Sequence, residues 1–140
     1  MERRAARITD VNLNRLTEGL KVVEDIVRLG LEQRALLRSV RALRHRLGRE
    51  TVTLRKSVVA FRDSEQDPGR GDRFDRAKRK DLEDVLLANF KRSEEAARVL
   101  EEVLKPSEPR LSARFKQVRF RLYDLEKKAV LAAARRGPGR

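Results

Sequence analysis

Apolar residues recur every three to four positions along almost the whole chain, which is the period of an α-helix. The alternation of apolar and polar residues that marks a half-buried β-strand is absent. The pattern therefore predicts an all-α helical bundle. Five helices are expected, over about residues 10–30, 32–47, 51–61, 76–104 and 111–134.

Residues that cap or break a helix mark the ends of these segments. Asp10 is expected to be the N-cap of the first helix and Gly30 its C-cap, while Gly48 interrupts the second helix. Residues 62–75, RDSEQDPGRGDRFD, contain Gly and Pro breakers and are expected to form a loop. Residues 1–136 are expected to form one helical domain and residues 137–140 a basic tail.

Two parts of the chain repeat each other. A shift of 77 residues places the first helix on the fourth, and a shift of 75 places VRALRHRL (40–47) on FKQVRFRL (115–122). The identical pairs include Asn12 with Asn89, Arg15 with Arg92, Glu18 with Glu95, Glu24 with Glu101, Arg44 with Arg119, and Arg46 with Arg121. We therefore predict two helical hairpins, about 10–47 and 87–122, linked by a short helix and loop over 48–75. An approximate two-fold rotation should relate them.

The repeat places an Asn and an Arg where the apolar stripe should continue. The two seams are expected to follow Ile8, Asn12, Leu16, Gly19, Val23 and Ile26, and Leu82, Leu86, Asn89, Ser93, Ala96, Leu100 and Val103. Polar residues beside small ones predict a pocket between the hairpins. Arg15 or Arg92 would need an anion there, either a Glu of the repeat or a phosphate. The structural alternative is that the Asn residues fix the helix register and the Arg residues snorkel.

Charge widens the range of partners. The chain has 35 Lys plus Arg against 22 Asp plus Glu, a net charge of +13, which attracts nucleic acid or phosphorylated small molecules. Nucleic acid is not favoured, because aromatic residues make up only 4% of the chain and no groove-reading motif is present. Abundant surface Arg and Glu are also typical of thermophilic proteins, so the excess charge is equally compatible with a solvated surface that binds no partner.

Other classes of protein are excluded by composition. The chain has no cysteine and a single histidine, His45, so disulfides and multi-histidine zinc sites are ruled out. No apolar run is long enough to span a bilayer, and the N-terminus does not resemble a secretory signal. A cytoplasmic protein is therefore expected.

The loop adds a second set of candidate groups. Arg62, Asp63, Asp67 and Arg70 lie near two glycines, which permit close approach of backbone to a phosphate, and the carboxylates could hold Mg²⁺. The loop is neither a Walker A motif nor a kinase glycine-rich loop. A plain solvated linker is the alternative interpretation.

Most of residues 7–127 is covered by five distinctive segments: RITDVNLNRLTEGLKVVEDIVR, LRHRL, FRDSEQDPG, DLEDVLLANFKRSEEAARVLEEVLK and RFKQVRFRLYDLEK. These segments resemble the all-helical hydroxymethylpyrimidine phosphate kinase family of thiamine biosynthesis, a domain often fused to thiamine phosphate synthase. The family pattern in the loop is approximately R-D-T-x-x-D-V-G-T. This chain departs from it at Ser64, Pro68 and Arg70, so both threonines of the pattern are missing, and the hydroxyl of Ser64 could substitute for one of them. No synthase barrel follows, so a free-standing version is expected.

The resemblance implies ATP-dependent phosphorylation of hydroxymethylpyrimidine phosphate to the pyrophosphate, with Mg²⁺ and ATP required. Joining two phosphorylated groups needs cations more than a protein nucleophile. Chemistry alone then assigns Arg15, Arg92 and Asp63 as catalytic candidates and Asp63 and Asp67 as metal ligands. The candidates for binding substrate or phosphate are Asn12, Asn89, Arg44, Arg62, Arg119, Glu18 and Glu95. The rival functions are a basic nucleic-acid-binding module and a non-catalytic partner of a thiamine enzyme. A thiamine phosphate synthase is a candidate partner, and a homodimer is compatible with the sequence.

Overall fold

Amphipathic helices account for nearly all of the regular structure, as the helical period predicts. The computed structural model describes residues 1–71 and 78–137, and within those ranges no strand is present. The elements are α1 (Arg3–Asp25), a π-helical turn η1 (Ile26–Leu31), α2 (Arg34–Glu50), α3 (Val52–Val58), a 3₁₀ turn η2 (Val59–Phe61), α4 (Leu82–Val103) and α5 (Pro109–Arg136). None of the described helices is long and apolar enough to cross a membrane.

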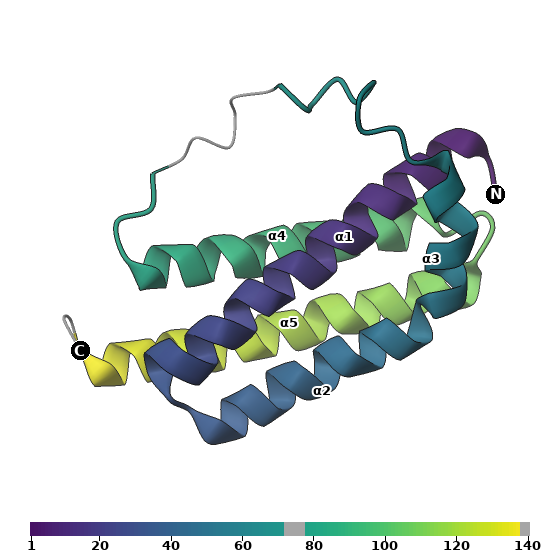
Figure 1. Cartoon of the computed structure of the whole chain (residues 1–140). Coiled ribbons are helices and arrows are strands. Elements are labelled where there is room, and N and C mark those ends of the chain that lie inside the picture. Colours follow the sequence, from purple (N-terminus) through teal and green to yellow (C-terminus); the bar gives the residue numbers. More distant parts are fainter. Residues whose placement is uncertain (72–77, 138–140) are drawn as a thin grey trace.

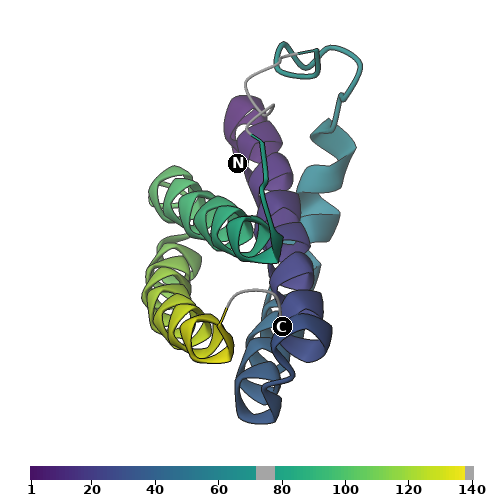
Figure 2. The same ribbon diagram turned by 90° about the vertical axis from the view of Figure 1, so that its left-hand side faces the viewer.

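The helices form two antiparallel hairpins that pack side by side. Helices α1 and α2 diverge from the turn that joins them, and α3 lies at the open end of this V, while α5 runs back along α4 (Figure 1). Seen from the side, α1, α2 and α3 lie on one side and α4 and α5 on the other (Figure 2). Helix α1 packs most extensively against α4, so the interface between the two hairpins lies at the centre of the fold. The largest side chains that are fully buried include Leu16, Leu20, Phe90, Leu100, Phe115 and Leu122.

A glycine allows α1 and α4 to approach closely where they pack together. A Cβ added at Gly19 would collide with the Ser93 hydroxyl and lie 2.9 Å from the carbonyl oxygen of Asn89. Ser93 donates a hydrogen bond of 3.0 Å from its hydroxyl to the carbonyl oxygen of Leu16. The small residues of the seam therefore serve a backbone contact between the helices.

The helix ends differ from the predicted ones in four places. The first helix begins at Arg3, so Asp10 is no N-cap: it lies buried in the middle of α1. Gly30 is no C-cap, because the π-helical turn runs through it and Glu32 takes the left-handed conformation, with a φ of 54°. Helix α2 continues through Gly48 to Glu50.

The fourth difference is the start of α4. This helix begins at Leu82 and not near Arg76, which falls among residues that the structure does not describe. Asp81 is its N-cap and accepts a hydrogen bond of 2.9 Å from the backbone N–H of Asp84, an ordinary capping contact. Helix α5 begins at Pro109, where a missing N–H costs nothing. Most of the basic tail, 138–140, lies outside the described residues.

The first residue of each predicted seam was wrongly expected to be buried. Ile8 and Leu82 are 42% and 60% exposed, while Thr9 and Asp10 are buried instead. The two-fold rotation that would relate the hairpins stays a prediction. Equivalent contacts in the two hairpins, described below, agree with it.

Candidate functional site

Helices α1 and α4 bring four of the repeated polar residues into one pocket. A cavity of about 220 Å³ is lined by Asn12, Arg15, Arg92, Glu95, Ala96 and Val99. Arg15 and Arg92 are exposed, and Arg15 makes no ion pair or hydrogen bond with any described residue. The two arginines occupy equivalent positions of the repeat, so they reach the same pocket from opposite helices. Their predicted catalytic roles stay predictions.

The two repeated asparagines make the same local contact. The Nδ2 group of Asn12 donates to the carbonyl oxygen of Ile8 at 2.9 Å, and that of Asn89 donates to Val85 at 2.8 Å. Both side chains are half-buried, although Asn89 does not line the pocket that holds Asn12. Glu95 lines this pocket, whereas its counterpart Glu18 does not. The pocket therefore uses the repeat unequally.

Two of the predicted phosphate ligands are held by carboxylates of the protein. Arg44 binds Glu24 with Nε–Oε1 at 2.9 Å, and Arg119 binds Glu101 with Nη2–Oε1 at 2.9 Å. Both carboxylates are buried, so each pair ties the two helices of one hairpin together. A role in phosphate binding would require either arginine to leave this partner.

Arg62 is likewise engaged within the protein. Its guanidinium forms a two-pronged pair with Asp10, with Nε–Oδ2 at 2.7 Å and Nη2–Oδ1 at 2.8 Å. The Asp10 carboxylate raises the pKa of Arg62. Arg7 also donates from Nη2 to the backbone oxygen of Asp63 at 3.4 Å. These contacts fix the start of the loop against the N-terminal half of α1.

The described part of the loop does not form a metal centre by itself. Asp63 accepts from the backbone N–H of Gln66 at 3.1 Å, and Asp67 accepts from that of Gly69 at 2.8 Å. Among the described residues, no group of three or more His, Asp or Glu side chains could hold a metal ion. Neither aspartate lines the pocket between α1 and α4. Residues 72–75 of the predicted loop lie outside the described residues.

Two charged groups with unusual surroundings were not singled out by the sequence. The pKa of Glu94 is raised to about 7, chiefly by burial and then by repulsion from Glu126, while Lys91 opposes the shift. Arg55 of α3 is half-buried, and burial lowers its pKa. The sequence did hold a sign that Glu94 is buried, because it lies one helical turn after Phe90 on the same face of α4. The predicted apolar seam included neither residue.

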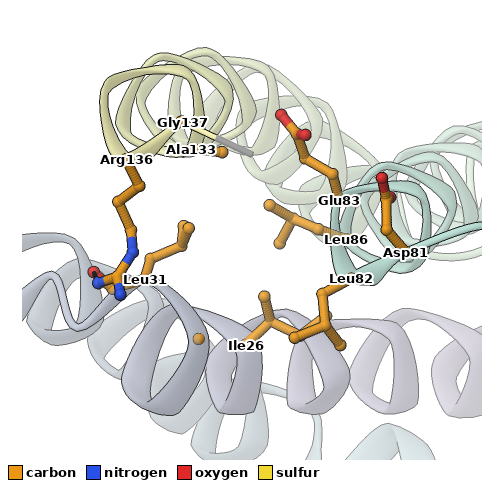
Figure 3. A pocket seen from close by; sticks show the side chains of 10 residues that line it. Ile26, Leu31, Asp81, Leu82, Glu83, Leu86, Ala133, Arg136 and Gly137 are labelled. Atoms are coloured by element: carbon orange, nitrogen blue, oxygen red, sulfur yellow. Dashed lines mark hydrogen bonds between the residues drawn. The ribbon is translucent and has the colours of Figure 1, made fainter. Parts of the chain in front are cut away.

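A separate pocket opens where α4 begins and α5 ends. Its volume is about 310 Å³, and apolar side chains of three segments, including Ile26, Leu31 and Leu86, form much of its wall (Figure 3). Arg136 spans its edge and donates from Nη1 to the carbonyl oxygen of Leu31 at 2.9 Å. None of the predicted site residues lines this pocket.

Comparison with known proteins covers most of the chain. The ThiD2 family matches residues 7–128. A thiamine-phosphate synthase of Gloeobacter violaceus is 44% identical over an alignment of 138 positions, and the match covers 92% of this chain and 39% of that protein. Thiamine-phosphate synthases of Thermosynechococcus vestitus and Synechocystis are both 42% identical, over 91% and 86% of this chain. The chain spans 34–39% of the length of the relatives it matches. No solved structure gives a significant match.

Proposed function

Because the chain belongs to the ThiD2 family, we propose that it transfers a phosphoryl group from ATP to hydroxymethylpyrimidine phosphate in thiamine biosynthesis. The product would be the pyrimidine pyrophosphate. The relatives named thiamine-phosphate synthases support a place in this pathway, while the kinase step itself is our proposal.

The pocket between α1 and α4 is the observation that carries the proposal. Arg15 and Arg92 line it together with the amide of Asn12 and the carboxylate of Glu95. Guanidinium groups bind phosphate oxygens in a fork geometry. The amide of Asn12 can both donate to and accept from an aminopyrimidine edge, and the carboxylate of Glu95 can accept from its amino group. The pocket volume of about 220 Å³ is below the usual 300–1,000 Å³ of ligand sites. The pocket therefore suits the small pyrimidine phosphate alone and is too small to hold ATP at the same time.

The reaction suits a site built from cations. A phosphate oxygen of the acceptor attacks the γ-phosphorus of ATP, the bond from that phosphorus to the bridging oxygen of ADP breaks, and a new P–O–P link forms. The acceptor oxygen is already an anion, so no general base has to remove a proton. The barrier lies in bringing two anions together, which arginine side chains reduce.

Mg²⁺ does not fit a site made by the described residues alone, since Asp63 and Asp67 each use an oxygen on a local turn and have no third acidic neighbour. Magnesium commonly binds one or two carboxylates together with the phosphates of a nucleotide. We therefore assign no step of the reaction to a protein-bound metal.

The proposal is tested by following ADP release with hydroxymethylpyrimidine phosphate and, separately, with the unphosphorylated alcohol. Product is expected only from the phosphate. Arg15→Gln and Arg92→Gln should each reduce turnover by about 100-fold, the usual effect of losing one group that stabilises the transition state. Their melting temperatures should stay near that of the wild type, because exposed residues contribute little to folding.

Arg49→Gln is the matched control, because Arg49 is an exposed arginine of α2 that lines none of the pockets above. It should keep wild-type turnover. No turnover of the phosphate by the wild type, or equal turnover by all three variants, would rule the proposal out.

A further inference from the structure

A second cluster of arginines lies on the other side of the bundle, between α2 and α5. These two helices leave a groove of about 650 Å³ between them. Its lining residues are Ala35, Arg38, Ser39, Ala42, Leu43, Arg46, Arg114 and Arg121. Half of them are arginines, and none is acidic or aromatic.

The groove carries an excess of positive charge that the protein does not neutralise. Glu50 is the partner of two of the arginines, with Oε1 at 2.6 Å from Nε of Arg46 and Oε2 at 2.5 Å from Nε of Arg114. Arg38 and Arg121 form no ion pair or hydrogen bond with any described residue. Among the described residues, the four guanidinium groups that line the groove thus have a single carboxylate, that of Glu50, as ion-pair partner, a balance that favours a ligand with several negative charges.

The repeat explains how the arginines converge. Arg46 and Arg121 are equivalent under the shift of 75 residues, and they line the groove from opposite helices. Arg44 and Arg119 lie two residues earlier, which is about 200° around an α-helix, and therefore turn inward to Glu24 and Glu101. The same repeated motif thus supplies one arginine to the core of each hairpin and one to the groove.

We propose that the groove between α2 and α5 binds a small ligand that carries two or more linked phosphate groups, an inorganic or a nucleoside oligophosphate. Guanidinium groups match phosphate oxygens in geometry, and the hydroxyl of Ser39 adds a further donor. The volume lies within the range of small-molecule sites. The absence of aromatic side chains from its lining indicates recognition of the phosphates and not of a base.

This site is distinct from the proposed kinase pocket. The groove is lined by α2 and α5 and the pocket by α1 and α4, so the two share no helix (Figure 1). A ligand in the groove would contact none of the residues that line the pocket between α1 and α4.

Calorimetric titration of the full chain with inorganic tripolyphosphate, at fixed ionic strength with EDTA present, tests the proposal without any readout of turnover. The wild type should bind with saturation. The double variant Arg38→Gln/Arg121→Gln should weaken binding at least tenfold, whereas Arg15→Gln should not. The matched control is Arg49→Gln/Arg110→Gln, which removes the same charge from exposed positions of the same two helices outside the groove.

A competition titration identifies the source of the phosphates. ATP should compete with tripolyphosphate at similar affinity if only the phosphates are recognised.

An NMR titration of the wild type keeps the test independent of the folding of any variant. The side-chain Nε–Hε signals of the groove arginines should shift on addition of tripolyphosphate. Lack of saturable binding, or equal weakening by the groove and control variants, would overturn the proposal. So would a single-stranded oligonucleotide that displaces tripolyphosphate and depends on the same arginines.

Discussion

The two hairpins share an internal ion pair but differ on the neighbouring helix face, called the flank here, which is formed by residues 14 and 17 in the first hairpin and by residues 91 and 94 in the second. Glu24 binds Arg44 in the first hairpin as Glu101 binds Arg119 in the second, each with an N–O distance of 2.9 Å. Both pairs join the first helix of a hairpin to its second helix. A buried carboxylate with a charged partner is therefore a common element that holds either hairpin closed.

The flanks have opposite character. In the first hairpin Arg55 of α3 donates to the side-chain oxygens of Asn14 and Thr17 at 3.1 and 3.0 Å. A shift of 77 residues replaces these by Lys91 and Glu94. The first flank is thus neutral and receives a cation from α3, which fills the open end of the V (Figure 1).

The second flank holds a buried acid instead, and α5 covers it directly. Lys91 lies 3.2 Å from Glu94 and 3.7 Å from Glu126 of α5, so one cation serves two carboxylates. The repeated ion pair thus closes each hairpin, while the unrepeated flank decides which element packs beside it.

Removing the shared carboxylates should give the largest effect and should break the equivalence of the two pairs. Glu101→Ala should lower the free energy of unfolding by about 3–5 kcal/mol, because it leaves a nearly buried guanidinium without its partner. Glu24→Ala should cost less, about 2 kcal/mol, since the side chain of Arg44 is 29% exposed against 13% for that of Arg119. Urea unfolding at pH 7 measures both.

The double variant Glu101→Met/Arg119→Met is the control for that prediction. Replacing both partners by apolar side chains of similar length should recover much of the loss. Equal losses for the two single variants, or no recovery in the double variant, would contradict the role given to exposure.

Contact between the hairpins gives the next effect. Gly19→Ala should destabilise the protein by about 3 kcal/mol, the upper part of the usual range for overpacking. The added methyl group meets the backbone carbonyl of Asn89, which cannot move without disturbing α4, and the Ser93 hydroxyl, whose rotation would break its hydrogen bond to Leu16. The equivalent change in the repeat, Ala96→Gly, should cost only about 1 kcal/mol, mainly through helix propensity. Thermal melts of the pair would contradict the packing argument if Gly19→Ala were neutral or stabilising.

Much of this architecture was within reach of the sequence. The period of apolar residues predicted the all-α class, and the shifts of 77 and 75 residues singled out the residues of both ion pairs. Asp10 was misjudged because an Asp before an apolar run looks like an N-cap, while its partner, Arg62, lies 52 residues away. A pair so distant leaves no local pattern.

The arginines of the candidate sites show a different limit. Arg44 and Arg46 match their counterparts equally well in sequence, yet only Arg44 faces a buried carboxylate. The angle at which the helices pack decides which of two arginines, two residues apart, turns inward. A sequence repeat alone does not reveal this angle. The partner of each arginine therefore had to come from the structure.

The acidic flank of the second hairpin predicts a pH dependence that the first lacks. The pKa of Glu94 is raised from 4.5 to about 7, first by burial and then by Glu126, so the folded protein holds this proton more tightly than the unfolded chain. The contribution of Glu94 to the free energy of unfolding should therefore be greatest below about pH 4.5 and should fall as the pH rises through about 7. Glu94→Gln should remove this fall and stabilise the protein by about 1–2 kcal/mol at pH 8. At pH 4.5 it should change little.

Melting temperatures between pH 4.5 and 8 check this prediction, with Glu95→Gln as the control because Glu95 is the exposed neighbour on the same helix. The control should keep the wild-type profile. A Glu94→Gln variant that also keeps it would show that the proton does not reside on this carboxyl group.

The smallest effect on stability should come from the repeated asparagines, and it separates a structural from a functional use of the repeat. Asn12→Ala and Asn89→Ala each lose a hydrogen bond to the carbonyl four residues earlier but gain helix propensity, so both should stay within about 0.5 kcal/mol of the wild type. Only Asn12 lines the pocket with Arg15 and Arg92. In the kinase assay Asn12→Ala should therefore raise the KM for the pyrimidine phosphate about tenfold, as expected for one lost hydrogen bond of about 1.4 kcal/mol, while Asn89→Ala should not. Equal kinetic losses in the two variants would mean that the asparagines act alike, and that the pocket between α1 and α4 does not set the binding of the substrate.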